Sequence, residues 1–97
     1  MSELTPMMRQ YRALKEQHPS AILLFRLGDF FEAFFDDAHL VARELQLTLT
    51  SRPVAKGQRI PMCGIPHHAL HGYLRRLIDR GHRVAICDQV EDPRHTK

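Results

Sequence analysis

Long apolar segments are missing from this sequence. The longest apolar run covers residues 21–25, whereas a helix that spans a bilayer needs about 20 apolar residues. Met1 to Glu3 are polar and an amphipathic segment follows them, which is not the pattern of a secretory signal peptide. These absences exclude a membrane-spanning class and indicate a cytoplasmic protein without a membrane partner.

Cysteine is also scarce, since the chain holds only Cys63 and Cys87. One pair of cysteines does not make a disulfide scaffold, so a reduced intracellular compartment is expected. At 97 residues the chain is long enough for one domain and one hydrophobic core.

Two classes of enzyme lack their sequence patterns here. The five glycines are widely scattered and no Gly-Lys-Ser/Thr occurs, so no phosphate-binding loop is present. No aspartate or glutamate is followed two positions later by lysine, as metal-dependent nucleases of mixed α/β architecture require. Asp36 and Asp37 are adjacent and are interpreted as favourable charges at a helix N-terminus. We therefore expect no catalytic residues in this chain.

A zinc site is an alternative interpretation of the segment that begins at Cys63. Its candidate ligands are one cysteine and the histidines near it, with a second cysteine further along: Cys63, His67, His68, His71 and Cys87. Structural zinc needs four ligands in spacings such as Cys-x-x-Cys paired with His-x-x-x-His, which this segment does not have. Pro61 and Pro66 explain the segment as a rigid loop without an ion.

Positive charge is concentrated in the second half of the chain. The whole chain has a formal net charge of +3, of which residues 1–48 carry −2 and residues 49–97 carry +5. Between residues 51 and 83 the only acidic side chain is Asp79, against seven basic ones: Arg52, Lys56, Arg59, Arg75, Arg76, Arg80 and Arg83. Such a basic patch indicates a polyanionic partner. The alternative is a solvated basic face.

The order of local patterns predicts an α/β (α+β) fold with a mixed β-sheet flanked by three α-helices in a single small domain. Helices are expected from Thr5-Pro6 to His18, from Asp36, and from His68 or Ala69 to Gly81. Strands are expected at residues 22–27, 30–35, 47–50 and 84–90, the last buried at residues 84–87. Gly28-Asp29 suits a two-residue hairpin turn. Residues 53–66, rich in proline and glycine, are expected to form a shaped loop with room for a short strand near residues 60–62.

The strand at residues 30–35 carries the most informative pair in the chain. Because strand side chains alternate between two faces, Phe30, Glu32 and Phe34 point one way and Phe31, Ala33 and Phe35 point toward a core. An aromatic ring can wedge into a base stack, and a carboxylate beside it can read a polar base edge. The ordinary interpretation is that Phe30 is a half-buried strand residue and Glu32 a solvated charge.

The residues together resemble the N-terminal mismatch-recognition domain of the MutS family of DNA mismatch repair proteins. The similarity runs from Thr5 to Pro93. Its most specific pieces are Arg26-Leu27-Gly28-Asp29-Phe30-Phe31-Glu32 and Ile60-Pro61-Met62-Cys63-Gly64-Ile65-Pro66-His67-His68.

This resemblance implies that Phe30 stacks on a mispaired or unpaired base in the minor groove while Glu32 hydrogen-bonds to that base. Arg52 and Met62 match segments beside the DNA and are secondary candidates. The implied partners are duplex DNA with a mismatch or small loop, further domains and a second subunit. ATP and magnesium are expected only in the full-length family protein. Residues 1–97 are then a domain of a larger, nucleoid-associated protein, truncated near a C-terminal strand. The alternative is a protein-interaction module in which Phe30, Phe34 and the basic loop dock a partner protein.

Overall fold

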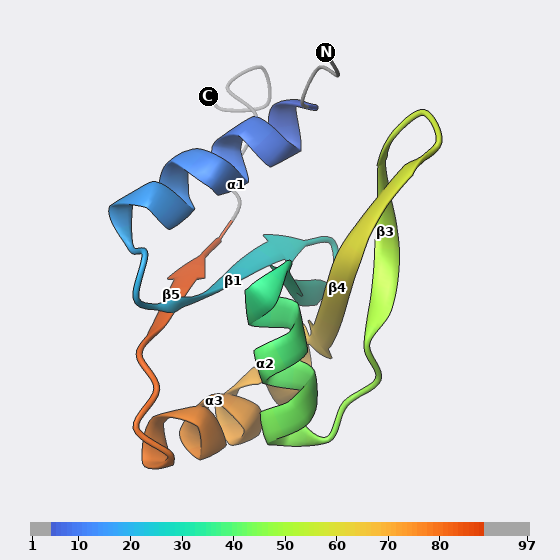
Figure 1. The fold of residues 1–97 in the computed structure, drawn as a ribbon. Coiled ribbons are helices and arrows are strands. Elements are labelled where there is room, and N and C mark those ends of the chain that lie inside the picture. Colours follow the sequence, from blue (N-terminus) through green and yellow to red (C-terminus); the bar gives the residue numbers. More distant parts are fainter. Residues whose placement is uncertain (1–4, 89–97) are drawn as a thin grey trace, which may run out of the picture.

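The computed structural model describes residues 5–88 and contains three α-helices and a five-stranded sheet (Figure 1). The elements in chain order are α1 Pro6–Gln17, β1 Ile22–Leu27, β2 Phe30–Phe34, α2 Asp36–Leu45, β3 Thr50–Ala55, β4 Gln58–Pro66, a 3₁₀ turn η1 His67–Ala69, α3 Leu70–Asp79 and β5 Val84–Cys87. No helix within this part of the chain is long and apolar enough to cross a membrane.

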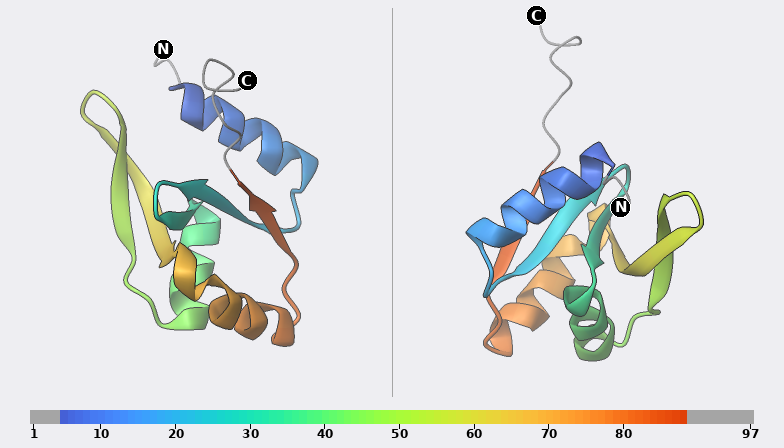
Figure 2. Two further views of the ribbon diagram at one scale, coloured as in Figure 1. Left: turned by 180° about the vertical axis from the view of Figure 1, so that it is seen from behind. Right: turned by 45° about the horizontal axis from the view of Figure 1, so that its top comes forward.

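The sheet is mixed, with the strand order β3-β4-β2-β1-β5. β5 runs parallel to β1, and the other neighbouring strands are antiparallel. Helix α1 lies over one face and α2 and α3 lie over the other, so the sheet is the middle layer (Figures 1 and 2). The predicted fold class is confirmed, including the three helices.

Each face of the sheet has its own apolar core. Under α2 and α3 the buried side chains are those of Ile22, Leu24, Phe31, Ala33, Ala38, Val41, Leu45, Cys63, Ile65, Leu70 and Leu77. Under α1 they are those of Met8, Tyr11, Leu23, Phe25 and Phe34. Because β1 is buried on both faces, its run of consecutive apolar residues has no polar alternation.

The first helix begins as its sequence predicts. The hydroxyl of Thr5 accepts a hydrogen bond of 3.2 Å from the amide of Met8, and Pro6 occupies the first helical position. The helix ends at Gln17, and the pyrrolidine ring of Pro19 disfavours helical backbone at the residue before it. Helix α3 likewise stops before Gly81, whose φ of 89° is typical of glycine after a helix.

A tight hairpin joins β1 to β2. Leu27 pairs with Phe30, so Gly28 and Asp29 form a two-residue turn as predicted. Gly28 has a φ of 63° while Asp29 has a negative φ, which is the pattern of a type II′ turn with glycine first. This turn fixes the register of the hairpin and therefore the face on which the side chain of Phe30 emerges.

The expected loop at residues 53–66 was wrong, because β3 and β4 form a long hairpin there (Figure 1). Pro53 is tolerated because β3 is an edge strand with a register shift between Pro53 and Ala55. Lys56 and Gly57 make the turn, and Gly57 has a φ of 71°. The expected strand at residues 47–50 was also wrong: β3 begins at Thr50, and the preceding residues connect it to α2.

Two predictions about burial were wrong as well. Phe35 does not point into the core with Phe31 and Ala33; β2 ends at Phe34, and Phe35 has a φ of 58° and 40% exposure where the chain turns into α2. Strand β5 is only partly buried because it lies at a sheet edge, and Ile86 is 42% exposed. The expected extension of that strand to residue 90 lies partly outside the described residues.

Candidate nucleic-acid interface

Phe30 stands at the first position of β2, beside the hairpin turn, with 45% of its surface exposed. It is followed by four buried residues, so the exposed ring is the exception within its strand. The antiparallel neighbours of Phe30 are Leu27 on β1 and Pro66 on β4. The backbone at this position is therefore held on both sides while the ring faces outward.

Hydrogen bonds fix the turn that carries Phe30. The carbonyl oxygen of Asp29 accepts a bond of 2.8 Å from the amide of His67, and Nδ1 of the same histidine lies 3.1 Å from that oxygen. The carbonyl oxygen of Gly28 accepts a bond of 2.8 Å from Nε of Arg26. Both turn carbonyls thus have partners, which restrains the turn in the free protein. No local sequence pattern predicts this role of His67, because only the folded chain brings η1 beside the turn.

Glu32 is not a solvated charge: its carboxylate is buried, with 6% of the residue exposed. Arg52 reaches across β4 from β3, and its Nη1 lies 3.1 Å from both Oε1 and Oε2 of Glu32. Loss of hydration raises the pKa of Glu32, and the nearby Arg52 guanidinium opposes part of that rise. Burial and the Arg52 guanidinium therefore act on the pKa of this carboxyl group in opposite directions.

Met62 lies on the same face of the sheet as Phe30 and Glu32. It pairs with Phe34 on β2 and with Thr50 on β3, and it is half-buried against the core under α1. Its neighbour two residues along β4, Gly64, pairs with Glu32. The four residues predicted for DNA contact, Phe30, Glu32, Arg52 and Met62, therefore share one face of the sheet, across β2, β4 and β3.

The third residue of the predicted outward set, Phe34, is fully buried. Its ring packs edge-on against Tyr11, with 5.1 Å between the ring centroids. The phenolic hydroxyl of Tyr11 donates a hydrogen bond of 3.3 Å to the carbonyl oxygen of Phe34. Phe34 lies on the same face of the sheet as Phe30 and Glu32, as predicted. Helix α1 covers this end of that face, so Phe34 cannot dock a partner protein.

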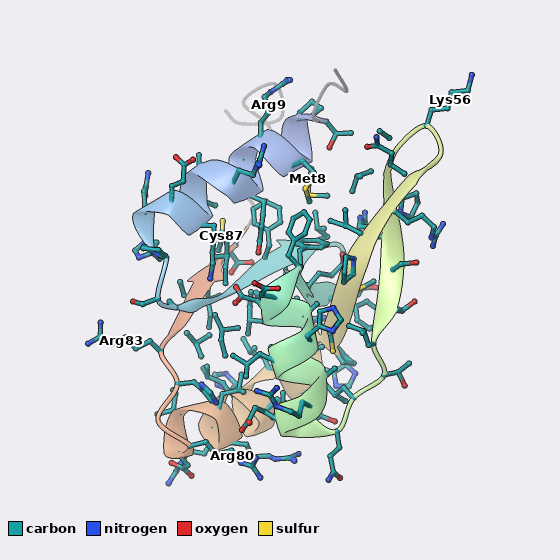
Figure 3. All side chains as sticks on the ribbon, in the orientation of Figure 1. Met8, Arg9, Lys56, Arg80, Arg83 and Cys87 are labelled. Carbon is teal, nitrogen blue, oxygen red and sulfur yellow. The ribbon has the colours of Figure 1, made fainter. Side chains whose placement is uncertain are left out.

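The seven basic side chains do not form one patch, contrary to the prediction. Lys56 lies at the tip of the β3–β4 hairpin, whereas Arg80 and Arg83 lie at the opposite end of the molecule (Figure 3). Several of these side chains also have partners: Arg80 lies 2.9 Å from Glu44, and Arg75 lies 3.5 Å from Asp79. Arg52 is therefore the basic side chain that the pairing of β2, β4 and β3 places on the face of Phe30.

The candidate zinc ligands do not converge. Cys63 is fully buried in the core under α2 and α3, where burial raises the pKa of its thiol. Among residues 5–88 no group of three or more His, Cys, Asp or Glu side chains could hold a metal ion.

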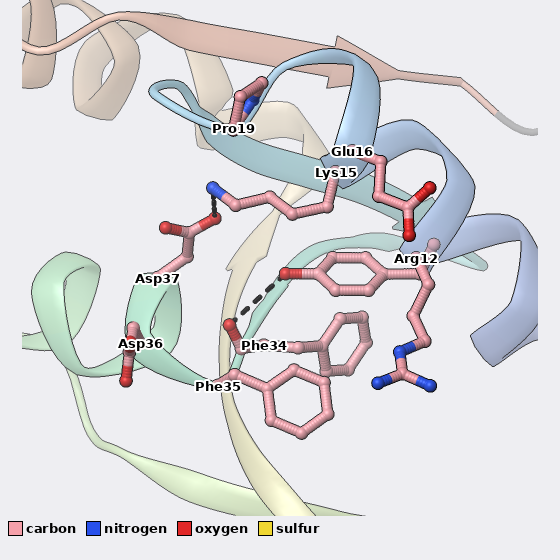
Figure 4. A pocket seen from close by; sticks show the side chains of 9 residues that line it. Arg12, Lys15, Glu16, Pro19, Phe34, Phe35, Asp36 and Asp37 are labelled. Carbon is pink, nitrogen blue, oxygen red and sulfur yellow. Dashed lines mark hydrogen bonds and ion pairs between the residues drawn. The ribbon is translucent and has the colours of Figure 1, made fainter.

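A separate pocket of about 410 Å³ lies between α1 and the start of α2 (Figure 4). Here Nζ of Lys15 lies 2.8 Å from Oδ2 of Asp37, which also accepts a bond of 3.1 Å from the amide of Leu23. Asp37 is therefore more than a favourable charge at a helix N-terminus: it links α1, β1 and α2. The ring of Phe35 lines the same pocket, away from Phe30.

Comparison with known proteins gives a consistent result over the whole chain. A family model described as MutS domain I matches residues 5–97. Similar curated proteins, each named DNA mismatch repair protein MutS, come from Brevibacillus brevis (56% identical over 97 residues, 100% of this chain), Solibacter usitatus (62% over 93 residues, 96%) and Syntrophomonas wolfei (57% over 97 residues, 100%). The chain spans 11% of the length of each of these relatives.

Proposed function

Because the chain belongs to the MutS domain I family, we propose that it recognises mispaired or unpaired bases in duplex DNA as one domain of a longer DNA mismatch repair protein. The observation that carries this proposal is the exposed ring of Phe30 on a restrained hairpin. The ring enters the minor groove as a wedge and stacks on the defective base. The rest of the longer protein contributes most of the affinity for DNA, together with any ATP and magnesium chemistry.

Discrimination comes from the cost of deforming the duplex. Separating two stacked base pairs costs a few kcal/mol per step. A mispaired or unpaired base has already lost part of its pairing and stacking, so the duplex bends more easily at that point. Stacking on an aromatic ring returns about 1–3 kcal/mol per base. A wedge that tests deformability in this way accepts many different mispairs.

Glu32 acts as the polar partner of Phe30. In the free domain Arg52 keeps the buried carboxylate paired. When DNA binds, the partly exposed Arg52 guanidinium moves to a phosphate, because Arg forms strong charge-assisted bonds with phosphate oxygens. Without Arg52, burial and the negative field of the DNA favour the neutral carboxyl group, which takes a proton from solvent. The neutral group then donates a hydrogen bond to a purine nitrogen.

Met62 provides apolar contact beside the wedge. Its thioether lies on the face that carries Phe30, and a flexible sulfur-containing side chain adapts to irregular surfaces. It carries no charge and reads no base edge, so its contribution is to exclude water next to the stacked ring.

The test is a titration of the full-length protein with matched and mismatched oligonucleotides, followed by fluorescence anisotropy. Phe30→Ala should abolish the preference for mismatched DNA, about a 5- to 150-fold effect if it removes the stacking energy. Weak, salt-sensitive binding to matched DNA should remain. Phe35→Ala is the control, because Phe35 is a second exposed phenylalanine that lies by the other pocket. A Phe30→Ala protein with unchanged preference rejects the proposal.

A salt series separates this function from the alternative of a protein-interaction module. Binding that neutralises phosphates weakens steeply as salt increases, whereas an apolar docking surface does not show this dependence. Binding to mismatched DNA that is insensitive to salt contradicts phosphate contacts by Arg52 and the hairpin.

A further inference from the structure

We propose that Gly64 is a positioning residue for mismatch recognition. Because glycine has no side chain, the ring of Phe30 can pack directly against β4 at this position. This inference rests on the proposed function, since it concerns the orientation of the wedge. Gly64 itself touches no base: it acts through the ring of Phe30.

The ring lies so close to Gly64 that a methyl group there would require it to shift by a few tenths of an ångström. A Cβ placed on Gly64 with ideal geometry would lie 3.3 Å from Cδ2 and 3.9 Å from Cγ of Phe30. It would also lie 3.7 Å from Sδ of Met62. The wedge ring and the methionine thioether therefore border the same small space above β4, and glycine leaves this space open.

Backbone conformation does not require glycine at this position. Gly28, Gly57 and Gly81 have φ angles of 63°, 71° and 89°, whereas the φ of Gly64 is not positive. A glycine inside a strand weakens that strand and often marks close approach of another group. The close approach of the Phe30 ring, and not the backbone conformation, is therefore the reason why glycine suits position 64.

Adding a methyl group would move the ring rather than the sheet. Gly64 is flanked by the fully buried Cys63 and Ile65, and it pairs with Glu32 on β2. The packing on both sides of the strand holds the backbone, while the Phe30 ring is about half exposed and free to swing outward. Gly64→Ala should therefore keep the fold and change the direction of the wedge.

The experiment compares Gly64→Ala with Gly72→Ala in the full-length protein, using matched and mismatched oligonucleotides. Gly72 is a suitable control because it has no positive φ and no atom within 4 Å of its added Cβ. Gly64→Ala should reduce the preference for mismatched DNA about threefold to tenfold, a part of the stacking contribution. Affinity for matched DNA and the Tm should stay close to wild type. Gly72→Ala should change neither the preference for mismatched DNA nor the affinity for matched DNA, although alanine inside α3 should raise the Tm slightly.

Phe30→Ala, measured in parallel, separates the two proposals. If Phe30→Ala loses the mismatch preference and Gly64→Ala keeps it, the positioning role is rejected and the proposed function stands. If Phe30→Ala keeps the preference, the proposed function fails. In a Phe30→Ala background the Gly64→Ala substitution should have no further effect on mismatch preference, because the ring it displaces is absent. A loss of affinity for DNA in the double variant, beyond the loss in Phe30→Ala alone, contradicts action through Phe30.

A wild-type NMR measurement decides the matter if Gly64→Ala does not fold. The Hα protons of Gly64 should be shifted upfield by the ring of Phe30, and Phe30→Ala should remove this shift. Equal Hα shifts of Gly64 in the two proteins contradict the packing of the Phe30 ring on Gly64.

Discussion

Arg52 and Glu32 form a buried contact in which one guanidinium nitrogen lies 3.1 Å from both carboxylate oxygens. The two residues belong to strands that are not neighbours, since β4 runs between β3 and β2. The contact therefore links the projecting hairpin to the strand that carries Phe30. It also places the positive charge of Arg52 where it lowers the pKa of Glu32, against the rise that burial causes.

Arg52→Ala should destabilise the protein, and the loss should depend on pH. At pH 7 the substitution leaves a buried carboxylate without its partner, which costs about 3–5 kcal/mol for a fully buried pair and less here because Arg52 is partly exposed. At pH values below the ordinary pKa of glutamate the carboxyl group is neutral and the loss should shrink. Urea unfolding at pH 7 and pH 4 measures the difference.

Arg59→Ala is the control for this measurement. Arg59 lies on the same hairpin, is exposed and donates hydrogen bonds to the hydroxyl and carbonyl oxygens of Ser51. Its replacement should change stability little at either pH, as is usual for exposed side chains. Equal losses for Arg52→Ala at pH 7 and pH 4 would show that the carboxylate of Glu32 is not the reason for the effect.

Glu32→Gln should become more stable relative to wild type as the pH rises from 4 to 7. The folded protein raises the pKa of Glu32 above its ordinary value, mainly because the group is buried. Below the ordinary pKa, Glu32 is protonated in both the folded and unfolded states and causes no penalty. As the pH rises through the ordinary and then the folded pKa, the unfolded state loses its proton first, and wild-type stability falls. Glutamine does not titrate, so the variant lacks this fall.

The same variant tests the hydrogen-bonding role of Glu32. Glutamine is a neutral donor, so a full-length Glu32→Gln protein should keep its preference for mismatched DNA. If the preference disappears while affinity for matched DNA is unchanged, a neutral donor is not the species that contacts the base.

Asp37→Ala should destabilise the protein by about 2–4 kcal/mol, because the substitution leaves a buried backbone amide without its acceptor and a partly buried ammonium group with only the carbonyl oxygen of Ala21. Those two donors are the amide of Leu23 and Nζ of Lys15. Asp36→Ala is the control: Asp36 is exposed, and losing its charge near the N-terminus of α2 should cost about 0.3–1 kcal/mol. Thermal unfolding of both variants measures the two losses of stability. Equal losses would show that position along the helix, and not the contacts of Asp37, sets the effect.

Much of the fold can be predicted from short-range patterns. Thr5 and Pro6 begin α1, Gly28 makes the first turn, and Gly81 follows α3, because each of these residues acts on the backbone next to it. The second hairpin was missed because Pro53 and Pro61 are typical of loops. Pro53 is tolerated because β3 is an edge strand, and Pro61 is tolerated because it lies just beyond the β4 residues that pair with β2; both are properties of the assembled sheet.

Some features of the candidate site follow from the local sequence, and others depend on the tertiary structure, as for the fold. Alternation along residues 30–34 determined that Phe30 and Glu32 share a face, because the side-chain period of a strand is local geometry. Three things depended on contacts between distant segments: the burial of Glu32 against Arg52, the covering of Phe34 by α1, and the approach of the Phe30 ring to Gly64. The sequence by itself thus determined which side chains share a face of the strand. The tertiary structure decided which of them are exposed, paired or held in place, because burial and pairing depend on residues that only folding brings together.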